Sequence, residues 1–180
     1  MTQKPYETVK DLVTGREVPN VGPEENRQAV EKFLLSEKGY FPEDILVSVP
    51  FSYELEGRTL SSEMDLLVRV QDAPAMVIRC VAGSVFSYER EALAAARIAM
   101  KTPIPVAVAT DGREASVLDT STGKSMGKGM EAIPGRETLI SFAREEPLPG
   151  LSPDKLQREK LIYRTYDSDT VNASRRMEKQ

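Results

Sequence analysis

The stretch "EMDLLVRVQDAPAMVIRCVAG", residues 63–83, constrains the fold of this chain more than any other. In its first part, Met64, Leu66 and Val68 alternate with other residues, which is typical of a strand with one apolar face. Its second part is almost wholly apolar, as expected for a central strand covered on both faces. The "QDAP" segment between them is a turn signal. The stretch therefore predicts two short strands joined by a tight turn.

The elements around this hairpin predict a mixed α/β sheet. A helix precedes it, starting near Pro23 and stopping at Gly39, and a strand over 45–55 follows that helix. Pro50 makes this strand an edge strand, or two strands with a kink. After the hairpin, the patterns predict a helix over 87–101, strands over 103–110 and 114–119, a short helix near 135–146 and a last helix over 152–167. This order fits the α/β class, with helices on both faces of a mixed sheet.

The length of 180 residues fits one domain plus tails. We predict an N-terminal arm over 1–21, which packs on the domain or stays loose. An α/β domain covers 22–145. A proline-rich linker, the last helix and a polar tail make up 146–180, with a frayed end from residue 168.

The composition excludes several kinds of site. The chain has no histidine and one cysteine, so Cys/His zinc sites, Ser-His-Asp catalysis and an intramolecular disulfide are excluded. A metal would need oxygen ligands, which favours Mg²⁺, Mn²⁺ or Ca²⁺. The net charge of −4 argues against avid nonspecific binding to nucleic acid. No segment has the pattern of a signal peptide or a membrane span, and we expect a cytoplasmic protein.

The hairpin carries an acid at the head of its first strand, Asp65, and Arg79, Cys80 and Val81 at the end of its second. Magnesium-dependent nucleases hold the metal with carboxylates against the scissile phosphate. An E-x-K pattern on a strand serves this chemistry, because residues two apart project from the same face. Here Arg79 and Val81 occupy the two positions of such a pattern.

Four segments carry a resemblance to the PD-(D/E)xK nuclease superfamily, more narrowly to the N-terminal domain of type I restriction enzyme R subunits. They are "GPEENRQAVEKFLLSEKGYFPEDI", "SSEMDLLVRV", "PAMVIRCVAG" and "EREALAAARIAMKTPIPVAVATDGREASVLDTSTGK", and they span roughly residues 20 to 125. The resemblance implies a restriction-endonuclease-like mixed β-sheet flanked by helices. It also implies a site built from a helix-1 glutamate, a strand aspartate and an E-x-K. The matching positions are Glu25 (alternatively Glu24), Asp65, Arg79 and Val81.

Of the three motif positions that the family places on this hairpin, only the aspartate is kept, at Asp65. Arg79 reverses the charge of a metal ligand, and a fixed cation there would compete with Mg²⁺ for Asp65. We therefore expect no intact catalytic residues, no cofactor unless the protein is active with Mg²⁺, and at most Asp65 and Glu25 as metal ligands. Asp65 either caps or hydrogen-bonds a turn, or it pairs with Arg79 across the hairpin. If the resemblance holds, the ion pair is favoured, because a buried arginine needs a carboxylate partner.

Other acids offer a rearranged site made of Glu63, Asp65 and Glu91. The interpretation favoured by sequence is that Glu89 and Glu91 complement the positive end of their helix, and that Arg90 and Arg97 are solvated.

Three functions stay open. The first is a degenerate nuclease-like domain, inactive in cleavage, that recognises a protein or, weakly, nucleic acid. The second is a metal-dependent nuclease with rearranged carboxylates. The third is an interaction module that uses the last helix, although packing of that helix on its own domain is favoured. Its candidate contacts are Leu156, Ile162, Tyr163 and Tyr166.

Overall fold

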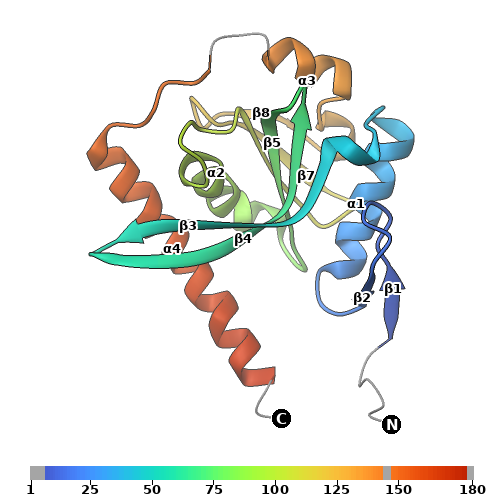
Figure 1. Cartoon of the computed structure of the whole chain (residues 1–180), viewed down its shortest axis with the longest axis horizontal. Coiled ribbons are helices and arrows are strands. Elements are labelled where there is room, and N and C mark those ends of the chain that lie inside the picture. The colour runs from blue at the N-terminus through green and yellow to red at the C-terminus, as the bar shows by residue number, and fades with distance from the viewer. Residues whose placement is uncertain (1–6, 144–146, 178–180) are drawn as a thin grey trace.

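A six-stranded sheet organises the chain in the computed structural model (Figure 1). The structure describes the backbone of residues 7–143 and 147–177, and the side chains of these residues except 143 and 168–177. The strand order is β3-β4-β5-β6-β7-β8. These strands are β3 (Ile45–Leu55), β4 (Arg58–Val70), β5 (Ala73–Cys80), β6 (Val106–Thr110), β7 (Ala115–Asp119) and β8 (Ser125–Lys128).

The sheet is mixed because one connection crosses over. Strands β3, β4 and β5 form an antiparallel meander, whereas β5 and β6 run parallel. Helix α2 (Glu89–Ile98) makes that crossover, and β6, β7 and β8 are again antiparallel. The predicted hairpin is therefore β4 and β5, joined at residues 71 and 72. Strand β3 is an unbroken edge strand that contains Pro50, one of the two forms that the sequence allowed.

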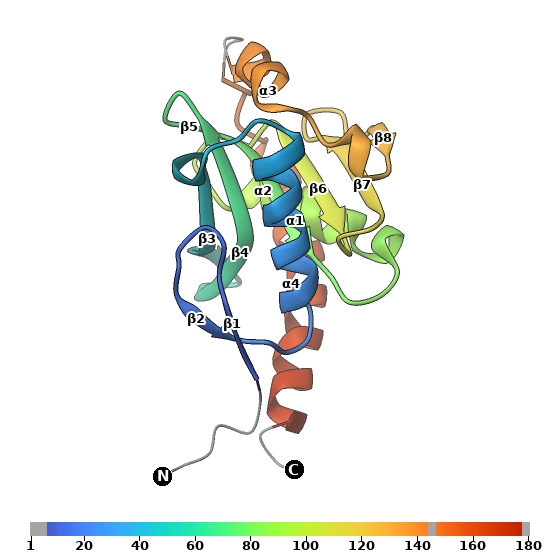
Figure 2. The ribbon, with the colours of Figure 1, turned by 90° about the vertical axis from the view of Figure 1, so that its right-hand side faces the viewer.

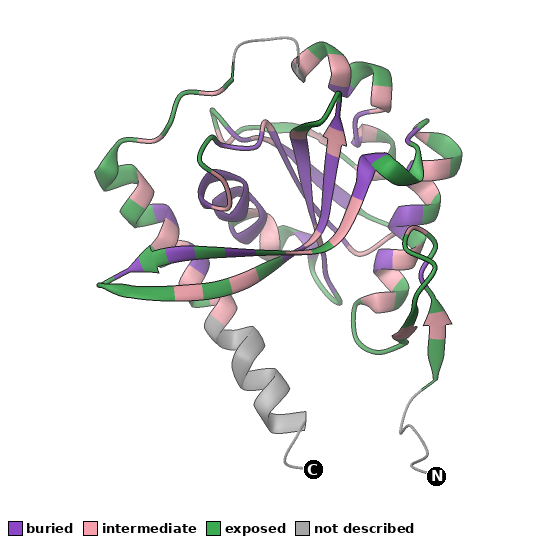
Figure 3. Cartoon of the chain, in the orientation of Figure 1, coloured by how far each residue is buried: buried purple, intermediate pink, exposed green. Residues whose placement is uncertain are grey.

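Side-chain alternation divides the core into two layers. Leu66, Val68 and Ile78 pack on the side of α1 (Glu24–Glu37) and α3 (Arg136–Ala143). Leu67 and Val77 pack on the opposite side, with α2 and α4 (Pro153–Met177). Figure 2 shows α1 and α4 on opposite sides of the sheet, and Figure 3 shows that the central strands and α2 are largely buried. The predicted α/β class, a mixed sheet flanked by helices, is confirmed.

Three segments differ from the sequence-based expectations. The N-terminal arm contains a small hairpin of β1 (Thr8–Lys10) and β2 (Glu17–Pro19), which the sequence did not predict. Strand β8 follows the turn after β7, where only the turn was expected. The prediction of a frayed tail from residue 168 was also wrong for most of that segment, because the backbone of α4 stays helical to Met177. The predicted domain boundary between residues 145 and 146 lies outside the described residues.

No helix in the described ranges is both long enough and apolar enough to cross a membrane.

Candidate functional site

Asp65 and Arg79 face each other across the β4–β5 hairpin. The pair lies one step beyond the Leu66–Ile78 register pair, on the face that carries α2 and α4. Arg79 Nη1 donates to both carboxylate oxygens of Asp65, at 3.0 and 2.9 Å. The backbone N–H of Cys80 donates to Asp65 Oδ2 at 2.7 Å. The predicted ion pair is therefore present, and it uses both oxygens of the aspartate.

Glu91 is the second carboxylate at Arg79. It lies in the first turn of α2, and its Oε2 is 3.2 Å from Arg79 Nε. The Glu91 side chain is only 3% exposed. Glu91 lies at the helix end as expected, but it is also buried against Arg79, a contact that the sequence did not predict. The sequence held one signal for this contact. A guanidinium has more donors than one aspartate can satisfy, so Arg79 called for a second acid near Asp65.

The expectation that Arg90 and Arg97 are solvated was wrong in part. The side chain of Arg97 is 6% exposed, and its Nη1 donates to Glu159 Oε1 at 2.6 Å. The half-exposed Arg90 lies 3.2 Å from Glu159 Oε2. Both contacts arise because α4 packs on α2, a long-range contact that periodicity within α2 does not reveal.

A cavity of about 490 Å³ opens beside the ion pair. Strand β4 contributes Glu63 and Asp65, β5 contributes Arg79, and α2 contributes Glu91. Helix α4 contributes Tyr163 and Asp167, and Ser61 and Ser62 complete the lining. Four carboxylates and one guanidinium thus line the cavity, so its charge is negative when all are ionised.

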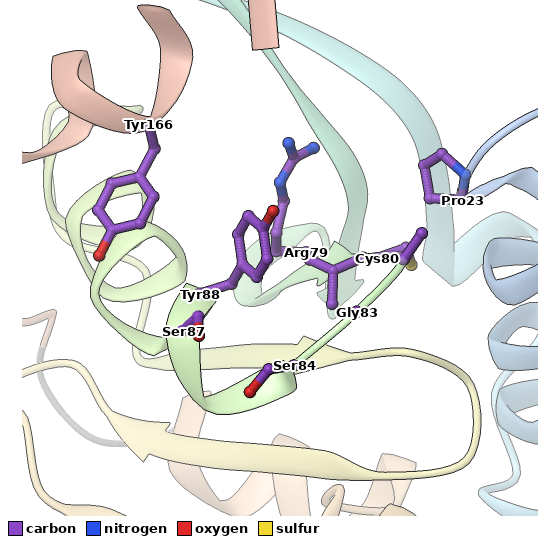
Figure 4. Close-up of a pocket in the computed structure, with 10 residues that line it drawn as sticks. Pro23, Arg79, Cys80, Gly83, Ser84, Ser87, Tyr88 and Tyr166 are labelled. Atoms are coloured by element: carbon purple, nitrogen blue, oxygen red, sulfur yellow. The ribbon is translucent and has the colours of Figure 1, made fainter. Parts of the chain in front are cut away.

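A second cavity, of about 560 Å³, lies at the carboxyl end of β5 and also touches Arg79. Tyr88 and Tyr166 line it, with ring centroids 6.2 Å apart. Ser84 and Ser87 line its other end, and the Arg79 side chain extends away from them (Figure 4). Arg79 therefore lines both cavities, and its guanidinium contacts two carboxylates of the acidic one.

The other two positions implied by the resemblance lie elsewhere. Glu25 is exposed on α1, and it does not line the acidic cavity. The reason is that α1 packs on the opposite face of the sheet from Asp65. The alternative, Glu24, is bound by Arg27 through a 2.6 Å contact.

Val81 is buried in the α2 side of the core, and its backbone extends the hydrogen bonding of the sheet. Its N–H donates to the carbonyl of Thr110 at 2.9 Å, and its carbonyl accepts from Asn26 Nδ2 at 2.7 Å. The structure thus brings Asp65 and Arg79 together, and it leaves Glu25 and Val81 outside their contact.

Burial governs the electrostatics of this site. Burial raises the pKa of the Glu91 carboxyl, and the neighbouring Arg79 offsets only part of that rise. Burial alone would lower the pKa of Arg79, but the carboxylates of Asp65 and Glu91 raise it above its ordinary value. Arg79 therefore stays charged at any ordinary pH. Burial also raises the pKa of the Cys80 thiol well above its usual range.

Within residues 7–143 and 147–167, no group of three or more Cys, Asp or Glu side chains is arranged to hold a metal ion. The candidate contacts on the last helix are occupied by the domain itself. Leu156, Ile162 and Tyr163 pack on the α2 side of the core, and Tyr166 lies against Tyr88.

Comparison with known proteins agrees with this architecture. A family described as the type I restriction enzyme R protein N terminus (HSDR_N) matches residues 22–134. Among solved structures, the fold is similar to a fragment described as an HsdR subunit of a type I restriction enzyme from Vibrio vulnificus YJ016, with a TM-score of 0.53 and 17% sequence identity. That similarity covers 67% of this chain and 25% of the Vibrio chain.

No curated protein matches the sequence. The family match covers more than half of the 180 residues. The chain therefore belongs to the family of type I restriction enzyme R protein N-terminal domains.

Proposed function

We propose that this chain is a non-cleaving member of its family, a degenerate PD-(D/E)xK domain that acts in recognition. The observation that carries the proposal is the contact between Asp65 and Arg79. In a nuclease of this type the aspartate would face a divalent cation. Here a guanidinium fixed to β5 stands against both of its oxygens, at 3.0 and 2.9 Å.

The donors around Asp65 do not fit Mg²⁺. The ion needs near-octahedral oxygen ligands at about 2.0–2.1 Å. Asp65 already accepts from Arg79 and from the Cys80 N–H, and Glu91 lies against the same guanidinium. A second positive charge would have to displace Arg79 from a site where that residue is largely buried. We infer that neither Mg²⁺ nor another cofactor is needed for the function of this chain.

The charge of the acidic cavity bears on what the domain recognises. Glu63, Asp65, Glu91 and Asp167 outnumber Arg79 on its walls. Carboxylates repel a phosphate backbone, so we expect a protein partner to be favoured and nucleic acid to bind weakly. Residual binding through scattered lysines and arginines would fall steeply as salt rises. Filter binding of duplex and single-stranded DNA at two salt concentrations tests this expectation.

The decisive experiment is a cleavage assay on the full chain. Purified protein is incubated with DNA and RNA substrates in the presence of Mg²⁺ or Mn²⁺, beside Asp65→Ala. The proposal expects no metal-dependent product from either protein. Turnover by the unsubstituted chain that disappears in Asp65→Ala would overturn it. That result would favour a nuclease with rearranged ligands, because Glu63, Asp65 and Glu91 line one cavity.

A further inference from the structure

A second buried charge cluster lies on the other side of the sheet and joins the N-terminal arm to α1. Its centre is Arg27, whose side chain is 7% exposed. Arg27 Nη1 lies 2.7 Å from Asp11 Oδ2 and also donates to Glu31 Oε1. Its Nη2 lies 2.6 Å from Glu24 Oε1. One guanidinium therefore serves three carboxylates, and the side chains of Asp11 and Glu31 are completely buried.

The cluster attaches the turn between β1 and β2 to the helix. Asp11 Oδ1 accepts the backbone N–H groups of Val13 and Thr14, at 3.1 and 2.6 Å. Gln28 on α1 accepts from the N–H of Leu12 at 3.2 Å. Asp11 thus shapes the turn with one oxygen and binds α1 with the other. The sequence left open whether the N-terminal arm packs on the domain or stays loose. In the structure the arm packs on the domain through residues 11–14.

The charges of this cluster do not balance if every group is ionised. Three carboxylates face one guanidinium, which leaves two uncompensated negative charges in a buried site. Arg27 binds Glu31 Oε1, whereas Glu31 Oε2 is buried without a side-chain donor, and the backbone N–H of Val13 offsets only a small part of the cost of burial. A buried anionic oxygen without a donor is costly, whereas a neutral carboxyl in the same place costs much less. Geometry alone therefore favours a protonated Glu31.

We propose that Glu31 is a proton-controlled clasp, which holds the β1–β2 hairpin on α1 when it is protonated and loosens the hairpin when it ionises. The groups that face Glu31 are Arg27 and Glu24 from its own helix, Asp11 from the turn and Cys80 from β5. Arg27 stays charged and Cys80 stays neutral near neutral pH. Asp11 stays ionised, because its hydrogen bonds to Thr14 and Arg27 outweigh its burial and lower its pKa. Glu31 is thus the member of this set whose charge changes near neutral pH.

The direction of the pH effect follows from linkage. Burial raises the pKa of Glu31 to about 7, and the attraction of Arg27 offsets only part of that rise. The docked state therefore binds this proton more tightly than an undocked state, where the pKa returns to an ordinary value near 4.5. The stabilisation of docking is complete below the ordinary value and is lost as pH rises through the docked value.

The clasp and Asp65 lie on opposite faces of the sheet. The charge of Glu31 acts on the buried thiol of Cys80, and the backbone N–H of Cys80 binds Asp65. On the same helix, Asn26 holds the carbonyl of Val81, and Pro23 lines the cavity at the end of β5. A change in how the hairpin holds α1 would therefore reach the loop that follows Arg79.

Nuclear magnetic resonance on the full chain tests the proposal. The carboxyl carbon of Glu31 is titrated from pH 5.5 to 8.5, and exchange of the Leu12, Val13 and Thr14 amides is measured relative to intrinsic rates. We expect Glu31 to titrate near neutrality and protection of these amides to fall about tenfold between pH 6 and pH 8. Glu31→Gln should abolish the pH dependence while the hairpin stays docked.

Glu37→Gln is the matched control, because Glu37 is an exposed glutamate on the same helix. It should behave as the unsubstituted chain does. A Glu31 that titrates below pH 5 would overturn the proposal. So would a loss of protection that persists in Glu31→Gln. The titration of the unsubstituted chain decides the question even if a variant fails to fold.

Discussion

A single nitrogen of Arg79, Nη1, lies 3.0 Å from Oδ1 and 2.9 Å from Oδ2 of Asp65, so both carboxylate oxygens share one donor group. This arrangement leaves Arg79 Nε for Glu91 on α2, at 3.2 Å. The guanidinium therefore connects β4, β5 and α2 at one point. In a metal-dependent nuclease, a divalent cation would make similar connections. Such an ion can dissociate, whereas Arg79 is covalently part of the chain.

The energy of this contact can be measured with a double-mutant cycle of Asp65→Ala and Arg79→Ala. Both side chains are about one-fifth exposed, so solvent screens the pair only in part. We expect a coupling free energy of about 1–3 kcal/mol in urea unfolding. The pair of Lys38 and Glu131 is the control, because its atoms are 3.6 Å apart and Glu131 is 90% exposed. Its coupling should be about 0–1 kcal/mol, and equal couplings would contradict the structural role given to Arg79.

Arg79→Glu should create a site for divalent cations. The substitution places a third carboxylate beside Asp65 and Glu91 and removes the competing cation. We expect Mg²⁺ or Mn²⁺ to bind this variant with a dissociation constant on the order of 1 mM and to raise its melting temperature.

Calorimetry and thermal melts with and without the metal measure both effects. The unsubstituted chain should show neither effect, and Arg90→Glu, next to Glu91 on α2, should resemble it. Equal metal stabilisation in the unsubstituted chain would mean that Arg79 does not block the site.

Glu159→Ala should destabilise the chain strongly. The side chains of Glu159 and Arg97 are 4% and 6% exposed, and the substitution leaves the arginine buried without its carboxylate partner. Breaking a buried pair in this way costs about 3–5 kcal/mol. Urea unfolding measures the loss, with Asp154→Ala, at an exposed position of the same helix, as the control. If Glu159→Ala lowers the free energy of unfolding less than the control does, α4 is not held to α2 through this pair.

Cys80 should be inert to thiol reagents in the folded protein. Its residue is 2% exposed, and burial raises the pKa of the thiol, so little thiolate is present at pH 8. A chromogenic disulfide reagent should label one thiol per chain in guanidinium chloride and almost none under native conditions. Because Cys80 is the single cysteine, the assay reads this position alone. Rapid native labelling would show that the end of β5 opens readily.

The parts of this structure that depend on local patterns could be predicted from the sequence. Alternation around Leu66 and the apolar run before Arg79 predicted the hairpin, and the hairpin placed Asp65 opposite Arg79. The contacts that were missed join distant elements. Glu91 and Arg97 look like ordinary surface charges of α2 until β5 and α4 cover them, and no periodicity within α2 reveals that cover.

The N-terminal hairpin and the end of α4 show a different limit. The polar residues 8–19 carry no apolar alternation, so their pairing depends on Asp11 and on α1 rather than on propensity. The segment after residue 167 is also polar, and low hydropathy made a frayed tail the expected outcome, although the backbone stays helical to Met177.

The alternation of side chains along β5 has a consequence for how this domain can change over evolutionary time. Arg79 and Val77 serve one layer of the molecule, whereas Ile78 and Cys80 serve the other. Replacements at positions 77 and 79 can therefore exchange one chemistry for another without altering the packing that positions 78 and 80 provide. A strand with two such independent sides allows the chemistry on one face to change in few steps, while the packing on the other face is inherited intact.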